Sequence, residues 1–400
     1  MSEHEDKKPD SLILSPSTGL AKTSSALVNR GLQDILRKGW YWEHQSLDFG
    51  GRLRKSLAIT VDGYVFTHHS LAKKDGRFGV EIHNLLSTDR HVWGSSFGGN
   101  ELADLEEINF ACSPLANACS PGLSMLCITR GVPDQPAELF IHTFGPFRLY
   151  PMPLCLDPVN SIQWSQSGTH LAVTFRSLNR TGGYIDLFKL FPSENRQPVR
   201  IESPVDGEWE TLPPVLEINK IASFDGSWFT NPATAGKYLL DSRPCFGKFA
   251  FSPDGATLAV GVYGPDFPEF VALLRLPTLE MFGVIGIPWL IDLSWSRAGH
   301  LLVCQDTPTL WEISPDGNSS LLLTSHDFPF EADLCRCSPT QNITALYSKE
   351  GCVRIVDLRD GSLLTEHCDV NDVAEMTWSS DGKSLFVVSA TGEAWIGSFQ

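Results

Sequence analysis

The sequence lacks the short motifs by which many enzymes hold a metal ion or a phosphate group. Its 400 residues contain no Cys-x-x-Cys pair, no His-Glu-x-x-His signature, no EF-hand loop and no glycine-rich loop with phosphate-binding spacing. Acidic residues are common, but no two of them have a spacing that identifies an acid–base pair. The sequence therefore names no catalytic residue, metal ligand or cofactor-binding residue, and we expect no cofactor.

Positive charge and long apolar segments are also scarce. The 31 Lys and Arg residues face 47 Asp and Glu residues, so the formal net charge is −16. Such a charge repels nucleic acid and acidic membranes at long range. The apolar stretch 281–291 is too short to cross a bilayer, and no apolar segment of a secretory signal follows the mostly charged first ten residues. We therefore expect a cytoplasmic protein that binds neither nucleic acid nor membranes.

The composition is typical of a packed protein with many turns. Apolar residues make up 42% of the chain, and 33 glycines and 26 prolines are present. The length allows two or three domains, although all-β units often reach this size as one. The ten cysteines have no disulfide-scaffold spacing. We expect them to be reduced core residues, as at Cys335 and Cys337 on one predicted strand.

One pattern recurs along the chain: an apolar strand ending in an aromatic, then Ser, a Gly turn, Leu and a second apolar strand. Its clearest copy spans residues 248–261, and others span 161–173, 293–303, 334–347 and 376–388. The anchor serines Ser252, Ser296, Ser338 and Ser379 are 44, 42 and 41 residues apart. Looser copies around Thr60, Ser113 and Ser165 complete a set of seven anchors.

Each clear copy is followed by a third apolar strand, as at residues 183–188, 309–313, 353–358 and 393–396. Three strands and a linking fourth make one propeller blade. Alternating apolar residues would fill both faces of such a sheet, and Asp-Gly permits the positive φ of a tight turn. Trp164, Trp295 and Trp378 each precede an anchor serine, so we expect them to be buried equivalents.

The chain resembles the WD40-repeat β-propeller family over about residues 40–400, on the spacing of these repeats. The resemblance implies an all-β fold with a seven-bladed β-propeller. The family's Gly-His pairs are missing, and its Trp-Asp dipeptide is replaced, for example by Val356-Asp357. At most the final blade is expected to keep part of the family's hydrogen-bond network, through His367, Ser389 and Trp395.

The segment before the first repeat predicts closure of the ring. Residues 39–47 are strand-like and are expected to pair with the final blade, which removes exposed sheet edges. Residues 17–38 predict an amphipathic helix with an apolar stripe, and residues 1–16 a disordered tail. The stripe either docks on the propeller or binds a partner; its candidate partner-binding residues are Leu27, Leu32 and Ile35.

The step from Ser165 to Ser252 is about twice the repeat. Residues 205–242 lack a clean repeat and are rich in proline and aromatics, so we expect an inserted loop. Residues 221–226 faintly match the anchor and leave an eighth, degraded blade open. Loops on rigid scaffolds often bind partners through aromatic anchors. The candidates are Trp209, Trp228, Phe229 and Tyr238, unless these aromatics pack on their own blades.

Four patterns could suggest chemistry, and each has a structural explanation. Gly94-Ser-Ser-Phe-Gly98 matches a nucleophile elbow but leads into another blade instead of a helix. Cys335 and Cys337 share a strand face, which is more typical of core cysteines than of metal ligands. The adjacent His68 and His69 point to opposite faces. Asp62, Asp254 and Asp381 are expected to form turns.

These observations favour a non-catalytic interaction scaffold or adaptor, a monomeric propeller within a complex of protein or peptide partners. The alternative is a propeller enzyme, lactonase-like or hydrolase-associated, with its site at the channel mouth. Convergent carboxylates or histidines with perturbed pKa values there would favour it. A regulatory module of a signalling chain would differ only in its partner. The fold alone does not decide between these functions.

Overall fold

The computed structural model describes the chain from residue 40 to residue 399, with gaps. The described residues are 40–47, 57–59, 63–72, 77–86, 90–94, 107–112, 125–131, 137–143, 148–156, 159–176, 182–192, 200–202, 209–211, 216–241, 243–263, 270–287, 289–328 and 330–399. The expected tail 1–16 and helix 17–38, with Leu27, Leu32 and Ile35, lie outside them. Asp62 and most of the Gly94–Gly98 motif do so as well.

The described residues are almost entirely β-structure, arranged in seven four-stranded antiparallel sheets and one two-stranded hairpin. Sheet one contains β2 (Leu57–Ile59), β3 (Tyr64–Ala72), β4 (Arg77–Asn84) and β5 (Arg90–Gly94). Sheet two contains β6 (Glu107–Cys112), β7 (Met125–Gly131), β8 (Ala137–Thr143) and β9 (Arg148–Leu156). Sheet three contains β10 (Val159–Trp164), β11 (His170–Arg176), β12 (Gly183–Pro192) and β15 (Leu216–Phe224). Sheets four and five contain β16 (Cys245–Phe251), β17 (Thr257–Tyr263), β18 (Phe270–Arg275) and β19 (Glu280–Gly286), and β20 (Asp292–Trp295), β21 (His300–Cys304), β22 (Thr309–Ile313) and β23 (Ser319–Leu323). Sheets six and seven contain β24 (Leu334–Cys337), β25 (Ile343–Ser348), β26 (Cys352–Asp357) and β27 (Leu363–Cys368), and β28 (Val373–Trp378), β29 (Ser384–Ser389), β30 (Glu393–Phe399) and β1 (Trp40–Ser46).

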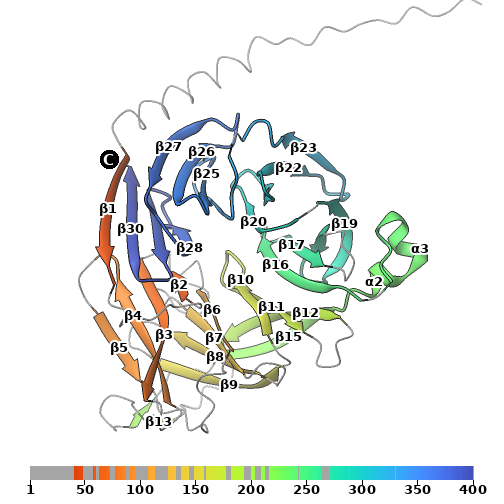
Figure 1. Cartoon of the computed structure of the whole chain (residues 1–400). Coiled ribbons are helices and arrows are strands. Elements are labelled where there is room, and N and C mark those ends of the chain that lie inside the picture. Colours follow the sequence, from red (N-terminus) through yellow and green to blue (C-terminus); the bar gives the residue numbers. More distant parts are fainter. Residues whose placement is uncertain are drawn as a thin grey trace, which may run out of the picture. The chain divides into compact units, whose positions relative to one another are not determined.

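The first strands of the sheets are neighbours in chain order. β2, β6, β10, β16, β20, β24 and β28 each contact the next, and β28 also contacts β2 (Figure 1). This is the arrangement of β-propeller blades. Because the strands are antiparallel, the connection from the second to the third strand lies at the end where the first strand begins. We call that end the loop end and the opposite one the turn end.

The chain divides by contacts into two units. Trp42–Ser398 forms the larger unit, and Met1–Tyr41 with Phe399–Gln400 forms the smaller. Within the smaller unit, the rings of Trp40 and Phe399 meet edge to face with their centroids 4.3 Å apart. None of the described helices is long and apolar enough to cross a membrane.

The hydrogen bonds of the anchor serines explain why Ser and Asp recur at these positions of the repeat. The hydroxyl oxygens of Ser252 and Ser379 accept the N–H groups of Thr257 and Ser384, each at 2.9 Å. The same hydroxyls donate to Asp254 at 2.6 Å and to Asp381 at 2.7 Å. Both carboxylates also accept the N–H two residues further on. The prediction that these aspartates form turns is confirmed.

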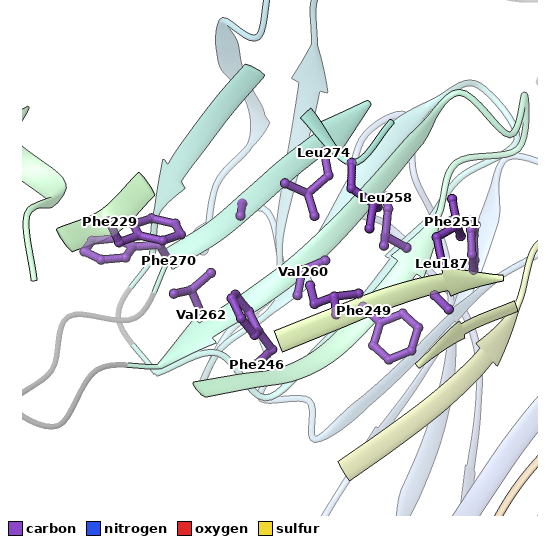
Figure 2. Packing of buried hydrophobic residues seen from close by; sticks show 14 of the residues in the cluster. Leu187, Phe229, Phe246, Phe249, Phe251, Leu258, Val260, Val262, Phe270 and Leu274 are labelled. Atoms are coloured by element: carbon purple, nitrogen blue, oxygen red, sulfur yellow. The ribbon is translucent and has the colours of Figure 1, made fainter. Parts of the chain in front are cut away.

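Alternation in the strands fills both faces of a sheet. Leu258 and Val260 of β17 pack with residues of sheet three, such as Leu187, in one cluster (Figure 2). Their neighbour Ala259 lies in a second cluster with residues of sheet five, such as Leu301. Because successive side chains point to opposite faces, one apolar strand packs against both neighbouring sheets. Each large side chain buried in this way contributes about 1.5–3 kcal/mol.

The equivalent tryptophans link neighbouring sheets. Trp164 and Trp378 are buried, and Trp295 is partly buried. The indole Nε1 of Trp295 donates to Ala250 O at 3.0 Å, and that of Trp378 donates to Arg336 O at 2.7 Å. Each acceptor lies on the first strand of the preceding sheet. The expectation of buried equivalents is confirmed for Trp164 and Trp378, and Trp295 keeps the equivalent contact.

The segment before the first repeat joins the last sheet, as the sequence predicted. β1 pairs with β30, and the N–H of Leu47 donates to Gly392 O at 2.7 Å. Figure 1 shows β1 beside β30. Leu47 lies in a cluster with residues of sheets one and seven, which places it between them.

Two details of the sequence prediction are wrong. Residues 205–242 are not one inserted loop, because Leu216–Phe224 is the fourth strand of sheet three and pairs with β12. A register shift between Leu187 and Phe188 and the charged Glu217 and Lys220 hide its alternation. The rest of the segment contains β14 (Trp209–Thr211), which pairs with the preceding β13 (Arg200–Glu202), and α2 (Ser227–Thr230), α3 (Pro232–Ala235) and η1 (Gly236–Tyr238). The eighth-blade candidate 221–226 is the end of β15 and its turn.

The second wrong prediction is that the final blade keeps part of the family's hydrogen-bond network. His367 stacks on Trp42 with ring centroids 4.6 Å apart. The Ser389 hydroxyl instead accepts the N–H of Glu393 at 2.9 Å. Among the hydrogen bonds of the described residues, none joins His367 to Ser389 or Trp395. The ring of His367 on β27 instead packs on Trp42 of β1.

Candidate functional site

The helical segment 227–238 is anchored to sheet four by the aromatics proposed as partner contacts. Phe229 is fully buried, and its ring stacks on Phe270 at 6.0 Å between centroids. Trp228 and Tyr238 are partly buried against the same cluster. Phe229 is therefore a core residue and not a surface anchor, because its side chain fills the joint between the helices and the sheet. Partner binding by Trp228 and Tyr238 stays a prediction.

The turn into this segment is tightly constrained. Gly226 has φ 71°, and a Cβ there would meet Pro244 at 2.8 Å. The N–H of Ser227 donates to Asp225 at 3.0 Å, and this bond is the main cause that lowers the pKa of Asp225. Asn231 caps α3 by accepting the N–H of Ala233. The segment is thus fixed at its entry turn and at the start of α3. Trp209, the fourth aromatic candidate, lies on β14 opposite Glu202 and is separate from this segment in the chain.

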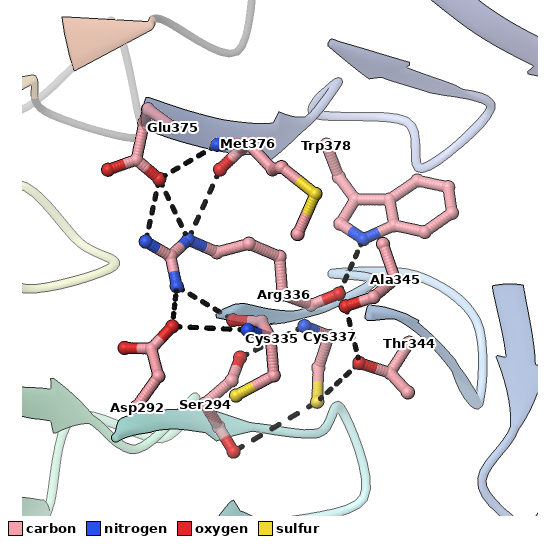
Figure 3. A network of polar contacts seen from close by, with 10 residues as sticks. All are labelled: Asp292, Ser294, Cys335, Arg336, Cys337, Thr344, Ala345, Glu375, Met376 and Trp378. Carbon is pink, nitrogen blue, oxygen red and sulfur yellow. Dashed lines mark hydrogen bonds and ion pairs between the residues drawn. The ribbon is translucent and has the colours of Figure 1, made fainter. Parts of the chain in front are cut away.

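A charged cluster crosses three sheets near the loop end. Arg336 of β24 donates to Asp292 of β20 and to Glu375 of β28, each at 2.6 Å (Figure 3). The guanidinium also donates to the backbone oxygens of Cys335 and Met376. Burial lowers the pKa of Arg336, but the carboxylates of Glu375 and Asp292 raise it, and the net shift is well upward.

This cluster is suited to holding sheets together. Every nitrogen of the Arg336 guanidinium donates to an acceptor of the chain itself. Asp292 is buried and accepts the N–H of Cys335 as well. A guanidinium whose nitrogens all bond to the chain itself is occupied in joining strands. We assign the cluster to the joining of sheets five, six and seven.

The positions of three charged residues in the sequence carry a signal for this cluster. Asp292 and Glu375 each stand four residues before an anchor serine, and Arg336 stands two residues before the intervening anchor. Opposite charges at matching places on first strands predict contact across neighbouring blades, since these strands are adjacent.

The thiols beside the cluster are inert. Burial raises the pKa of Cys337 to about 12 and raises the pKa of Cys335 well above its usual value. The pKa of the neighbouring Cys304 is also raised by burial. Only the thiolate is a good nucleophile or metal ligand. Their assignment as core residues therefore fits the structure better than a metal site.

Two other cysteines correct a prediction. Cys352 of β26 and Cys368 of β27 form a disulfide, whereas the sequence predicted reduced cysteines throughout. They are 16 residues apart, and strand register places them opposite each other, which no motif reveals. Glu366 completes a group whose ligand-type atoms lie within 4.8 Å of one another. While the disulfide is formed, this group offers no thiolate to a metal ion.

The loop end of sheets five to seven is acidic. The described connections at this end carry one lysine, Lys349, and six carboxylates, which belong to Asp306, Glu331, Asp333, Glu350, Asp369 and Asp372. Asp327 lies in the same connection as Glu331, but we do not count it with these six, because its backbone lies beside Gly361 at the turn end. Lys349 bonds Asp333 at 2.7 Å, and Arg354 of β26 bonds Glu350 at 3.4 Å, which leaves the other four carboxylates in excess.

One large aromatic is displayed at the same end. Trp289, in the connection from β19 to β20, is 61% exposed. Its φ of 59° belongs to the left-handed region, which a residue with a Cβ seldom adopts. Leu239, after η1 in the preceding such connection, is 45% exposed. The loop end thus combines negative charge with exposed apolar side chains.

Comparison with known proteins identifies the fold. No protein-family model matches the chain, and no curated protein matches it by sequence. Among solved structures, Sqt1 of Chaetomium thermophilum bound to the N-terminus of the ribosomal protein L10 aligns with a TM-score of 0.52 and 15% identity, covering 86% of this chain and 83% of that one. Sqt1 alone gives a TM-score of 0.52 at 15% identity, covering 86% and 81%. A further Sqt1 structure gives 0.51 at 13%, covering 89% and 99%. These likenesses show a WD40-type β-propeller fold.

Proposed function

We propose that this chain is a non-catalytic propeller that binds a basic protein segment or peptide at the loop end of sheets five to seven. The excess of carboxylates over cations in the connections at this end is the observation that carries the proposal. The structurally similar Sqt1, which was solved with a peptide segment bound, supports the idea that such a fold can serve as a peptide-binding scaffold.

The charges would act mainly on encounter and orientation. A surface of one sign raises association rates by about 10- to 1,000-fold at low salt. Its effect falls with ionic strength, because charges separated by more than about 8–10 Å are screened near physiological salt. We therefore propose that the partner carries several Lys or Arg residues.

Trp289 would supply the apolar part of the contact. Exposed tryptophans are frequent anchors at protein interfaces, and an indole can also stack on a guanidinium. Leu239, Trp228 and Tyr238 of the neighbouring helical segment extend the surface that a partner could cover. Phe229 would act indirectly, by holding that segment on sheet four.

We also propose a blade count and a quaternary state. The seven described sheets are proposed to be the full set of blades, with β1 closing the ring. We propose that the protein works as a monomeric propeller within a complex, in the cytoplasm. Partner contacts by Leu27, Leu32 and Ile35 remain part of the proposal as a second binding element.

The test is a charge-reversal pair with matched charge change. Glu331→Lys with Glu350→Lys alters the loop end, and Glu280→Lys with Glu312→Lys alters exposed strand positions elsewhere. Binding of the chain to arrays of Lys/Arg-rich, neutral and acidic peptides would be measured. We expect Lys/Arg-rich peptides to bind the chain and its control variant, and to bind the loop-end variant at least tenfold more weakly. Equal loss in both variants, or a preference for acidic peptides, would reject the proposal.

A further inference from the structure

The Cys352–Cys368 disulfide lies at the boundary between the sheet and the loop end. Cys352 is the first residue of β26 and Cys368 the last of β27, and the two are directly paired. Cys352 is buried, whereas Cys368 is exposed. A soluble thiol or disulfide can therefore reach the sulfur of Cys368, with Cys352 as the protected second sulfur.

Paired strand positions allow the bond to form or break without rearranging the sheet. The register of β26 and β27 sets Cys352 opposite Cys368 and Arg354 opposite Glu366, on the same face. Arg354 bonds Glu366 at 3.0 Å, and Glu366 lies 3.4 Å from the Cys368 sulfur. The ladder and this ion pair hold the two strands in place in either state of the sulfurs.

The segments next to the two cysteines belong to the acidic loop end. Gly351 and Glu350 directly precede Cys352, and Asp369 directly follows Cys368. The N–H of Val370 donates to Gly351 O at 2.9 Å, which joins the two connections. Asp369 and Asp372 have φ of 69° and 52°, in the left-handed region that Asp enters more readily than most residues with a Cβ, so this connection has a defined turn conformation.

We infer that Cys352 and Cys368 are a reversible thiol–disulfide pair whose oxidised form fixes these two connections. The consequence for partner binding rests on the function proposed above; the chemistry of the pair does not. In a cytoplasm, low-molecular-weight thiols and disulfides would set the balance between the two forms.

The exchange is balanced with a low-molecular-weight disulfide such as oxidised glutathione. The Cys368 thiolate attacks one of its sulfurs, forms a mixed disulfide and releases one thiolate. The Cys352 thiolate then attacks the Cys368 sulfur and releases the second thiolate. The pair loses two protons and two electrons, and the glutathione disulfide gains both electrons; reduction follows the reverse path.

A redox titration tests the pair directly. The full chain is equilibrated in glutathione buffers of graded ratio, quenched with acid, unfolded and alkylated, and each cysteine is measured by mass spectrometry. We expect Cys352 and Cys368 to be protected in equal fractions and without added glutathione mass at every ratio, while the exposed free Cys245 is either alkylated or carries glutathione. Unequal protection, or glutathione carried on Cys368 without an internal bond, would overturn the inference.

Hydrogen exchange tests whether the disulfide restrains the two connections next to the cysteines. Amides of residues 349–351 and 369–372 should exchange at least fivefold faster in the reduced chain than in the oxidised chain. Cys368→Ser should show the fast rate in both buffers, and Cys245→Ser should respond as the unaltered chain does. Redox-independent exchange in the unaltered chain would reject the structural role, even if a variant fails to fold.

A binding titration distinguishes failure of the thiol–disulfide pair from failure of the proposed peptide binding. The Lys/Arg-rich peptide of the preceding section is titrated into the oxidised and reduced chain. We expect a difference of at least threefold in Kd. Equal binding would overturn the link between the pair and the loop end. Binding by neither form would reject the proposed function, while the titration and the exchange rates still decide the pair.

Discussion

The two ends of the sheets are built from the same strands and differ in kind. At the turn end of sheets five to seven, the described turns carry three cations and three carboxylates: Arg297, Arg359, Lys383, Asp316, Asp360 and Asp381. The loop end of the same sheets carries six carboxylates and one lysine. The turn end repeats a motif that satisfies its own polar groups, whereas the loop end varies from blade to blade. A rigid repeated frame with one variable end is suited to recognition.

Contacts between sheets also differ at the two ends. At the turn end, Thr340 Oγ1 donates to Asp381 O at 2.9 Å, and Arg297 donates to Thr340 O. Near the loop end, the buried Asp292 and the partly buried Arg336 and Glu375 join three first strands. The turn end is thus joined by surface hydrogen bonds and the loop end by a partly buried ion cluster, and the two ends should respond differently to substitution.

The largest effect is expected from removing the closing strand. Deleting residues 1–47 removes β1 and exposes the edge of β30. Because an edge strand and the buried Leu47 are both lost, we expect the free energy of unfolding to fall by more than about 5 kcal/mol. Deletion of residues 1–38 keeps β1 and is the matched control. Equal urea midpoints of the unaltered chain and the 1–47 deletion would show that β1 does not close the last sheet.

A smaller but still large effect is expected at the cluster of Arg336, Asp292 and Glu375. Arg336→Ala leaves Asp292 buried without its cation, which costs about 3–5 kcal/mol. Arg297→Ala at the turn end loses an exposed hydrogen bond and should cost below about 1 kcal/mol. Thermal and urea unfolding of the two variants would be compared. Similar losses would show that the two ends are tied with equal strength.

The next largest effect is expected from replacing an anchor serine. Ser379→Ala removes a hydroxyl that donates to Asp381 and accepts the N–H of Ser384. The substitution should cost about 1–3 kcal/mol, because the N–H and the carboxylate lose their partner. Ser398→Ala, which alters a strand hydroxyl near the same turn, should cost less. The same unfolding assays apply, and a cost below that of Ser398→Ala would remove the anchor role from Ser379.

The smallest effect is a dependence on acid. The hydrogen bond from Ser379 is the main cause that lowers the pKa of Asp381, and the N–H of Lys383 adds to it. A carboxylate with a lowered folded pKa stabilises the fold fully above its unfolded value, about 3.9. That contribution is lost as the pH falls through the folded pKa.

Asp381→Asn should therefore flatten the fall in Tm between about pH 4 and pH 2. Melting curves across this range, recorded for the variant and the unaltered chain, would measure the change. Parallel acid limbs in the two proteins would mean that Asp381 does not contribute to the acid sensitivity of the turn end.

The turn end was largely readable from the sequence. The Ser, Asp and Gly of each repeat form local contacts, so their spacing alone predicted the turns at Ser252 and Ser379. Trp378 and Trp164 were predicted as buried for the same reason, since each precedes an anchor. β15 was missed because a register shift interrupts its pairing with β12 and charged residues dilute its alternation.

The candidate site was much less readable. Phe229 was proposed as a surface anchor, but local sequence does not say which aromatic of an adjacent pair points inward. Trp289 was not singled out, because its exposure depends on the path of one connection. The acidic residues of the loop end are scattered over residues 306–372 and come together only when the sheets pack.

By itself the sequence determined the repeat, the turns, the alternation of the strands and the entry of residues 39–47 into the last sheet. These features arise from contacts among neighbouring residues or from a period that can be counted. Only the tertiary structure decided the Arg336 cluster, the Cys352–Cys368 bond, the burial of Phe229 and the gathering of carboxylates at the loop end. Each of these joins residues from different strands or sheets, and the register and packing that bring them together have no local signature.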